Sequence, residues 1–270
     1  MNHQYVLLES RGGIATVTLN DPGKLNPLSI PLQSEFAQVM AQIRSDDSIR
    51  AVILTGAGKA FCVGADLNSL DPAKMAAEGK STGRSVAEMM RKLTNPIVTT
   101  LRALPVPTVS VVNGPAVGAG VGLALAADIV LAARSAYFSL PFMPSLGIIP
   151  DVGTTWFLPR MVGRARATGL TLLGNRLSAS QAADWGLIWA CLEDADLSAE
   201  MLSMGERLAA LPSHAALEVR AAYDQAETST LVGQLEYERG RQLELLDGPW
   251  FSEGVNAFVD KRKPIFNRRA

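Results

Sequence analysis

Apolar and polar positions follow two periods along the first 200 residues, and each period predicts one kind of element. Short apolar runs, such as AVILTGAG from residue 51 and TVSVVNG from residue 108, predict buried strands that end at glycines. Residues 32–44 carry apolar side chains at helical spacing, and we expect further helices over 84–103 and 118–127. Strands and helices that alternate in this order predict an α/β fold.

Three segments depart from this alternation. YVLLESRGGIATVTLND predicts two strands joined at Gly12 and Gly13 as a hairpin. Residues 71–85 are polar, contain glycines and show no period, so we expect a mobile loop there. From residue 197 the pattern is helical throughout, with no strand between the helices. We therefore divide the chain into a core of residues 1–196 and a C-terminal helical region of residues 197–270, an appendage of the kind that often packs on a neighbouring subunit.

Composition and charge narrow the possible classes of protein. The chain of 270 residues is 48% hydrophobic, which is enough to bury a large core, and its formal net charge is -1. Its basic run, KRKPIFNRR, lies at the end of the chain, so we expect no nucleic-acid partner. The N-terminus shows no secretory signal, and Asn113, Pro115 and Asp128 interrupt the apolar stretch at 111–133. We expect no membrane partner and a cytoplasmic location.

The cysteines and histidines of the sequence indicate neither a metal site nor a catalytic nucleophile. Cys62 and Cys191 are far apart and form no CxxC pair, so neither a zinc site nor a disulfide is expected. His3 and His214 lie outside every motif, which argues against a Ser-His-Asp triad and against a histidine-ligated metal. We expect no metal.

Two glycine-rich turns follow buried strands and are the candidate chemical sites. They are TGAGKAFCVGADLNSL at 55–70 and NGPAVGAGVGLALAAD at 113–128. The spacing of Gly118, Gly120 and Gly122 does not fit a dinucleotide fingerprint, and neither turn fits a P-loop. Glycines let the backbone turn sharply and let a ligand approach N–H groups at the start of a helix. The two turns therefore favour an oxyanion hole over a phosphate-binding site.

Six segments in this order resemble the enoyl-CoA hydratase/isomerase family, also called the crotonase superfamily. They are AFCVGADL, VNGPAVGAG, DIVLAARSAYF, LGIIPDVG, GNRLSASQAADWGLI and EGVNAFVDKRKPIF, and they cover nearly the whole chain. The resemblance implies a crotonase-like spiral of repeated ββα units with a C-terminal helical region used in trimer formation. It also implies acyl-CoA substrates, no cofactor apart from the coenzyme A of the substrate, and a homotrimer or homohexamer.

The resemblance assigns the oxyanion hole to the backbone N–H groups of Ala65 and Ala119. Such donors stabilise the negative charge of a thioester enolate, each by on the order of 10²–10³ in rate. The backbone near the first turn is implied to meet the adenine end of coenzyme A, and the C-terminal region of the same or another subunit is implied to reach it. The implied binding residues are Ala60, Phe61, Cys62, Val63, Gly64, Gly118, Gly120, Phe142, Met143, Phe258 and Lys261.

The residues that vary within the family point away from water addition. Hydratases of the family carry two glutamates; Gly122 stands at the first position, and Phe142 or Met143 stands at the second. Asp151 is a carboxylate that remains in this neighbourhood, and an aspartate there is found in family isomerases, including dienoyl-CoA isomerases. The stretch 149–189 looks most like the isomerases of ring-1,2-epoxyphenylacetyl-CoA.

One base can remove a proton from one carbon and return it to another. We therefore expect an acyl-CoA isomerase in which Ala65 and Ala119 hold the enolate oxygen and Asp151 moves the proton. Two alternatives stay open: an enoyl-CoA hydratase that uses other residues, and a family member that binds acyl-CoA without turnover.

The carboxylates also have structural interpretations. Asp151 could cap the helix that begins near Thr154. As a base, it would be desolvated by apolar neighbours, which would raise its pKa; these are Ile148, Ile149, Val152 and Trp156. We expect Asp66 in a turn, Asp128 as a structural partner and Glu88 on a helix surface, and we expect Cys62 to be a small buried apolar residue.

Overall fold

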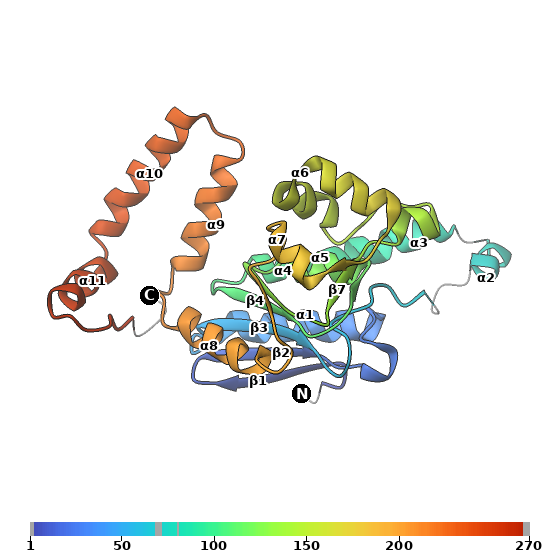
Figure 1. The fold of residues 1–270 in the computed structure, drawn as a ribbon, viewed down its shortest axis with the longest axis horizontal. Helices are drawn as coiled ribbons and strands as arrows, with labels where there is room; N and C mark the ends of the chain where they lie inside the picture. Colours follow the sequence, from blue (N-terminus) through green and yellow to red (C-terminus); the bar gives the residue numbers. More distant parts are fainter. Residues whose placement is uncertain (1–2, 68–71, 80, 267–270) are drawn as a thin grey trace.

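The computed structural model describes residues 3–67, 72–79 and 81–266 and shows a sheet-centred core with a projecting helical arm (Figure 1). Helices cover both faces of the sheet, and the arm leaves the core next to helix α8 (Leu197–Ala209). The predicted α/β class with a helical C-terminal region is confirmed.

The centre of the core is a six-stranded sheet in the order β1-β2-β3-β4-β6-β9. β1 and β2 form the predicted antiparallel hairpin, and every later neighbour pairs in parallel. Side chains of β3 and β4 are buried along nearly their whole length, as expected for strands covered on both faces. The strands are β1 (Val6–Arg11), β2 (Ile14–Leu19), β3 (Ala51–Gly56), β4 (Thr108–Val112), β6 (Ile129–Ala133) and β9 (Ala190–Leu192).

A smaller three-stranded sheet joins β5 (Ala116–Val117), β7 (Tyr137–Ser139) and β8 (Leu177–Ser178). β5 lies inside the second glycine-rich turn and pairs in parallel with β7. The amide of Gly118 continues this pairing by donating to the carbonyl of Ser139 at 2.9 Å. The small sheet therefore fixes the second turn against the segment that follows β7.

The core helices lie close to their predicted positions. α1 (Ile30–Ser45) buries an apolar face, and the Ser29 hydroxyl caps its start. The helix predicted over 84–103 is divided by a π-helical turn, and the one predicted over 118–127 is shorter. The remaining helical elements of the core are η1 (Pro22–Lys24), α3 (Thr82–Met89), η3 (Met90–Thr94), α4 (Asn95–Arg102), α5 (Ala119–Leu125), η4 (Phe142–Leu146), α6 (Thr154–Leu173) and α7 (Ala179–Asp184). No helix among the described residues has both the length and the apolar character that a bilayer span requires.

The prediction of a loop over 71–85 is wrong for most of that segment. α2 (Pro72–Ala77) is helical, and α3 begins at Thr82, while residues 71 and 80 lie outside the described part of the chain. α2 begins with a proline, is rich in residues of high helix propensity, and is followed by Gly79 at φ 68°. Six residues are too few to display a period, so the pattern missed this helix.

The C-terminal helices are of two kinds. α8 (Leu197–Ala209) packs against the sheet, where a Cβ at Gly205 would lie 2.9 Å from Cδ1 of Ile53. α9 (Ala215–Ala226), α10 (Leu231–Leu246) and α11 (Pro249–Val259) form the projecting arm (Figure 1). The run of helices begins at residue 197, but its first helix is packed on the core and the arm starts one helix later.

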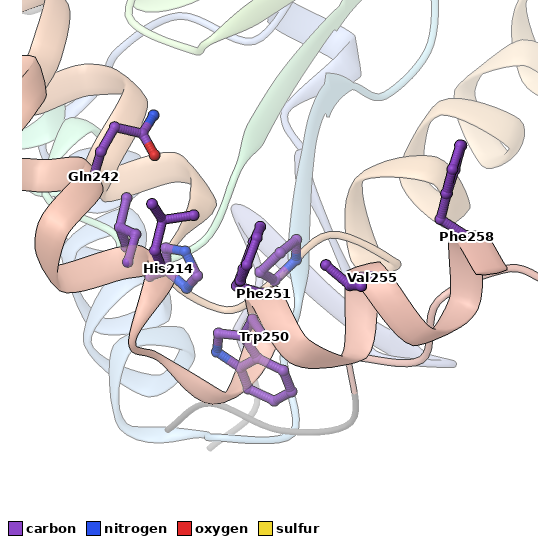
Figure 2. Close-up of a pocket in the computed structure, with 10 residues that line it drawn as sticks. His214, Gln242, Trp250, Phe251, Val255 and Phe258 are labelled. Carbon is purple, nitrogen blue, oxygen red and sulfur yellow. The ribbon is translucent and has the colours of Figure 1, made fainter.

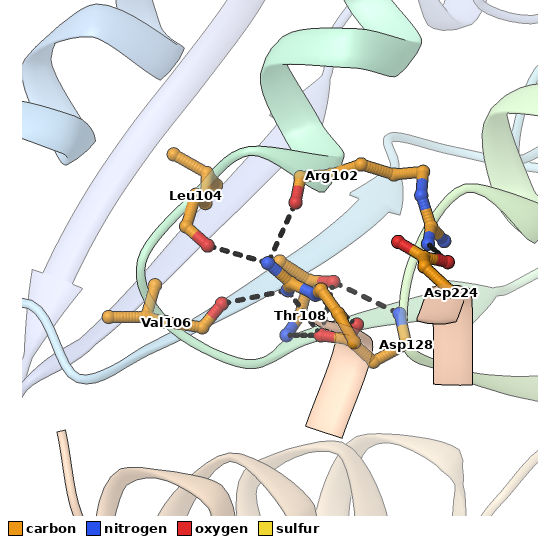
Figure 3. Close-up of polar contacts among 7 residues, drawn as sticks. Arg102, Leu104, Val106, Thr108, Asp128 and Asp224 are labelled. Carbon is orange, nitrogen blue, oxygen red and sulfur yellow. Dashed lines mark hydrogen bonds and ion pairs between the residues drawn. The ribbon is translucent and has the colours of Figure 1, made fainter. Parts of the chain in front are cut away.

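Arg220 of α9 ties the arm to the core through Asp128 and the segment that follows α4. Figure 3 shows the surroundings of Asp128. Its guanidinium donates to both carboxylate oxygens of Asp128, at 2.6 Å each, and Asp128 also accepts from the amide and hydroxyl of Thr108. The other guanidinium hydrogens reach the backbone carbonyls of Arg102, Leu104 and Val106. The Arg220 side chain is only 10% exposed. Asp128 is thus a structural partner, as predicted.

Arg220→Met is expected to lower the free energy of unfolding by about 2–3 kcal/mol, because Asp128 and three carbonyl oxygens would lose their donor in a largely buried place. Equilibrium urea denaturation measures the change. Arg239→Met is the control, since Arg239 pairs with Glu236 on an exposed face of α10. Equal stability of the two variants would contradict the anchoring role of Arg220.

Candidate active site

The two glycine-rich turns are packed directly against each other. A Cβ at Gly64 would lie 2.8 Å from the carbonyl oxygen of Val117 and 3.0 Å from the amide nitrogen of Ala119. A Cβ at Gly120 would lie 2.2 Å from the carbonyl oxygen of Cys62. The amide of Val117 donates to that same Cys62 oxygen at 2.9 Å. The two turns are therefore in backbone contact, and glycine is required at both places.

This contact brings the expected oxyanion-hole donors to one place. Ala119 is the first residue of α5, so its N–H has no acceptor within the helix. Ala65 pairs with Leu28 through an isolated bridge in which Leu28 donates to the carbonyl of Gly64 at 2.7 Å. Neither the Ala65 N–H nor the Ala119 N–H has an acceptor among the described residues. Both are available to an oxygen of a ligand.

The first turn is held by two asparagines that the sequence analysis missed. Asn26 is fully buried, and its Nδ2 donates to the carbonyls of Ala57 and Ala60 at 2.9 and 2.8 Å. Asn113 Nδ2 donates to the carbonyl of Gly58 at 3.0 Å. Asn26 has a left-handed backbone, with φ 57°. The sequence signal for this role was an asparagine directly before a proline, because asparagine tolerates the left-handed conformation in turns.

Most of the residues expected to bind coenzyme A near the first turn have side chains that are buried in the core. The side chains of Ala60, Phe61 and Cys62 are fully buried in the core. Burial raises the pKa of the Cys62 thiol to about 12, which agrees with a small buried apolar residue. Val63 is half-buried. The amides of Phe61 and Cys62 donate to the carbonyl of Pro115, at 3.1 and 3.2 Å, so the backbone here is also engaged within the protein.

Neither hydratase position carries a carboxylate, and packing closes the first of them to any side chain. A Cβ at Gly122 would lie 2.3 Å from the carbonyl oxygen of Val152 and 2.7 Å from Oγ1 of Thr154, so no side chain fits there. Phe142 is buried, and its ring would contact a Cβ at Gly118 at 3.7 Å. Of the two candidates for the second position, Phe142 is thus the residue that touches the oxyanion turn.

Met143 faces a different space, an apolar hollow of about 560 Å³ against α6. Ile149, Pro150 and Thr154 share this lining, so the hollow flanks the segment that contains Asp151. Its walls also include residues from both halves of α6, which bends at Gly163, where φ is 77°.

Asp151 stands in a tight turn immediately before α6. The two residues that follow it, Val152 and Gly153, both have left-handed backbones, with φ 51° and 74°. A β-branched residue in this region is strained and persists only where the surroundings enforce it. The cap interpretation of Asp151 is wrong, because Gly153 is the N-cap and no side chain caps this helix. Thr154 donates instead to the main-chain carbonyl of Asp151 at 2.9 Å.

The carboxylate of Asp151 is partly desolvated. Burial raises its pKa above the ordinary value, and its Oδ1 is buried without a hydrogen-bond partner. Of the expected apolar neighbours only Val152 is buried, whereas Ile148 and Ile149 are 50% and 70% exposed and Trp156 is also exposed. An unpartnered buried oxygen is costly, and a bound ligand could satisfy it.

The structure does not bring Phe258 and Lys261 to the glycine turns within one chain. Phe258 is 84% exposed on α11, at the far end of the arm from α5 (Figure 1). It borders a hollow of about 430 Å³ inside the arm (Figure 2). Other residues around this hollow include His214, Trp250 and Phe251. Any contact of Phe258 or Lys261 with a ligand at the turns would require another copy of the chain.

Two further expectations concern acidic residues and metals. Glu88 is exposed and pairs with Arg91 and Lys92 at 2.8 and 2.9 Å, which lowers its pKa to about 2. It is a surface residue, as predicted. In the described parts of the chain, no group of three or more His, Cys, Asp or Glu side chains could hold a metal ion.

Comparison with known proteins identifies one family. The sequence model of the family described as "Enoyl-CoA hydratase/isomerase" matches residues 9–269. The chain is 43% identical to "1,2-epoxyphenylacetyl-CoA isomerase" of Escherichia coli (strain K12), over 97% of this chain and 98% of that protein. It is 37% identical to "Probable enoyl-CoA hydratase" of Rhodobacter capsulatus over 100% of both chains. A crystal structure of an enoyl-CoA hydratase from Polaromonas sp. JS666 is similar with a TM-score of 0.87 at 30% identity, covering 96% and 98% of the two chains.

The fold and the paired turns define a crotonase-fold enzyme of acyl-CoA thioesters. The chain belongs to the enoyl-CoA hydratase/isomerase family. The predicted family and the crotonase-like fold are confirmed.

Gly64→Ala is expected to lower kcat by about 10²–10³, because its Cβ would separate the turns that carry the two N–H donors. Steady-state turnover of an enoyl-CoA substrate measures the loss. Gly12→Ala is the matched control: Gly12 also has positive φ, 60°, but nothing lies within 4 Å of its Cβ position. If the two variants lost activity equally, backbone strain rather than the contact between the turns would be responsible.

Proposed function

We propose that this protein is an acyl-CoA isomerase that works with an oxyanion hole and one carboxylate. The observation that best supports this proposal is that a carboxylate is present at Asp151 and absent from both hydratase positions. Gly122 and Phe142 leave no acid at the hydratase positions, while Asp151 is present nearby with a raised pKa and an unpartnered Oδ1. One base suffices for moving a proton between two carbons, whereas hydration also requires activation of a water.

In the proposed reaction, the Ala65 and Ala119 N–H groups hold the thioester oxygen. The carboxylate of Asp151 removes a proton from a saturated carbon whose electron pair can delocalise into the thioester carbonyl. The electron pair moves toward the oxygen, and the two donors stabilise the resulting enolate. The protonated carboxyl then returns the proton to a different carbon, which regenerates the base.

The raised pKa of Asp151 suits both steps. A base with a higher pKa binds the proton more strongly, and desolvation provides this increase without a second charge. The carboxyl must be ionised to start the reaction, so activity is expected to rise with pH through the raised pKa of this group.

The proposal also covers the acyl group, the cofactor and the location of the protein. Similarity to the Escherichia coli protein favours ring-1,2-epoxyphenylacetyl-CoA, and linear enoyl-CoA or dienoyl-CoA are further candidates. The coenzyme A moiety belongs to the substrate, no separate cofactor is proposed, and the cytoplasm is the proposed location. Similarity to the Rhodobacter capsulatus protein favours enoyl-CoA hydration as the second candidate function. A protein that binds acyl-CoA without turnover is the third candidate, and the retained Asp151 argues against it.

Asp151→Asn is expected to lower isomerase turnover by about 10²–10⁴, because the amide cannot accept the proton. The assay supplies 3-enoyl-CoA, 2-enoyl-CoA and the ring epoxide in ¹⁸O-labelled water, and mass spectrometry identifies the products. The wild-type enzyme should shift a double bond or open the ring epoxide without incorporating ¹⁸O. Its rate should fall as pH is lowered through the raised pKa of Asp151.

Glu9→Gln is the control for loss of a carboxylate, since Glu9 lies exposed on β1. It should retain wild-type turnover. Full activity of Asp151→Asn, or labelled 3-hydroxyacyl-CoA as the main wild-type product, would overturn the isomerase proposal. Binding of all three esters without any product would support the non-catalytic candidate.

We also infer that the arm assembles copies of this chain into a homotrimer or homohexamer. No residue of α10 is buried, although the helix carries several large apolar side chains, including Leu231, which is 76% exposed. Phe258 and Val259 extend this exposed apolar surface onto α11. Surfaces of this kind mark protein interfaces, and a second copy would also bring Phe258 and Lys261 toward a site.

Light scattering after size exclusion is expected to give three or six times the chain mass of 28.7 kDa. Replacing Leu231, Val232 and Leu235 together with glutamate should shift the mass toward one chain, because the charges would face a desolvated interface. Replacing Glu9 with lysine changes an exposed charge outside the arm and should leave the mass unchanged. A wild-type monomer at micromolar concentration would contradict assembly through the arm.

A further inference from the structure

A cluster of aromatic and arginine side chains connects the arm to the turn that holds Asp151. Trp156 and Phe157 lie in the first turn of α6, and both amides donate to the carbonyl of Gly153, at 2.9 and 3.0 Å. The ring of Phe157 covers Gly153 so closely that a Cβ there would lie 2.7 Å from Cε2. The two rings meet edge to face with centroids 5.0 Å apart.

Two guanidinium groups lie over these rings. Arg160 lies 4.2 Å and Arg102 lies 5.5 Å from the centroid of Trp156, and Arg102 also lies 5.7 Å from that of Phe157. Arg160 additionally donates to the carbonyl of Trp156 at 2.9 Å. We call Trp156, Phe157, Arg102 and Arg160 the Trp156 cluster.

Helix α9 of the arm holds both arginines from outside the core. Glu227 accepts from Arg160 at 2.9 Å, and Asp224 pairs with Arg102 at 3.5 Å (Figure 3). Arg220, four residues before Asp224 on the same helix, is anchored on Asp128 and on the carbonyl of Arg102. The spacing of four and three residues places Arg220, Asp224 and Glu227 on one face of α9. That face therefore connects to α4 and α6 at several points.

The turn that contains Asp151 is strained, so neighbouring elements must hold it in its conformation. Val152 and Gly153 adopt left-handed conformations, and a buried valine keeps such a conformation only if the adjoining elements prevent relaxation. On one side Gly122 of α5 contacts the turn. On the other side the Trp156 cluster fixes the first turn of α6.

We propose that the Trp156 cluster is a positioning device through which α9 holds the catalytic carboxylate of Asp151 in place. Trp156, Arg160, Asp224 and Glu227 are then positioning residues rather than catalytic residues. The inference rests on the proposed function of Asp151 as the base. It links the seating of the arm on the core to turnover.

The test compares Trp156→Leu and the double variant Asp224→Asn/Glu227→Gln with the wild-type enzyme. We expect kcat to fall by about tenfold or more in both, because small displacements of a catalytic group are costly, while KM changes by no more than about twofold. Hydrogen exchange of the peptide covering residues 150–158 should become faster in both variants. Trp156→Phe keeps a ring for the arginines and should recover most of the lost kcat.

Glu236→Gln is the matched control, since it breaks an exposed ion pair on α10 that does not contact the cluster. It should leave kcat and exchange unchanged. Wild-type kcat in a folded Trp156→Leu enzyme would overturn the inference, and so would a loss of kcat without faster exchange in residues 150–158. Full activity of Asp151→Asn would instead overturn the proposed function, while the exchange data would still show whether the cluster fixes the turn.

Discussion

The direct backbone contact between the two glycine-rich turns is the constraint on which the rest of the site depends. Gly64 lies against the amide of Ala119, and Gly120 lies against the carbonyl of Cys62, with no room for a Cβ at either place. The parallel pairing of β3 with β4 brings the turns to the same edge of the sheet. The buried side chain of Asn26 fixes the first turn by donating hydrogen bonds to two of the carbonyls of that turn. Two N–H groups from distant parts of the chain are thus brought close together by backbone packing and by the Asn26 side chain.

The same closeness decides which acids the site can hold. α5 approaches the Asp151 turn so closely at Gly122 that the carbonyl of Val152 occupies the space of a side chain. This packing excludes a carboxylate from that position. Asp151 remains as a partly buried carboxylate, and burial raises its pKa.

The arm is joined to the core by charged contacts along one face of α9. Arg220 anchors α9 at the edge of β4 and β6, and the acidic residues that follow it hold arginines over Trp156. These charged contacts are partly exposed, so each alone adds little stability. Several contacts on one helix face can nevertheless restrict a strained turn. The apolar surfaces of α10 and α11 face outward and agree with assembly of several copies.

From the sequence alone, the resemblance of six ordered segments indicated the family, and local periodicity and glycine spacing indicated the α/β alternation, the hairpin and the two turns. It also located Asp151 and the missing glutamates. It missed α2, whose six residues carry no period, and it missed Asn26, whose amide group donates to carbonyls more than 30 residues away. Only the tertiary structure excluded the capping role of Asp151, placed Phe142 rather than Met143 on the oxyanion turn, and separated Phe258 from the site. These outcomes depend on contacts between segments far apart in the chain, and no local pattern encodes such contacts.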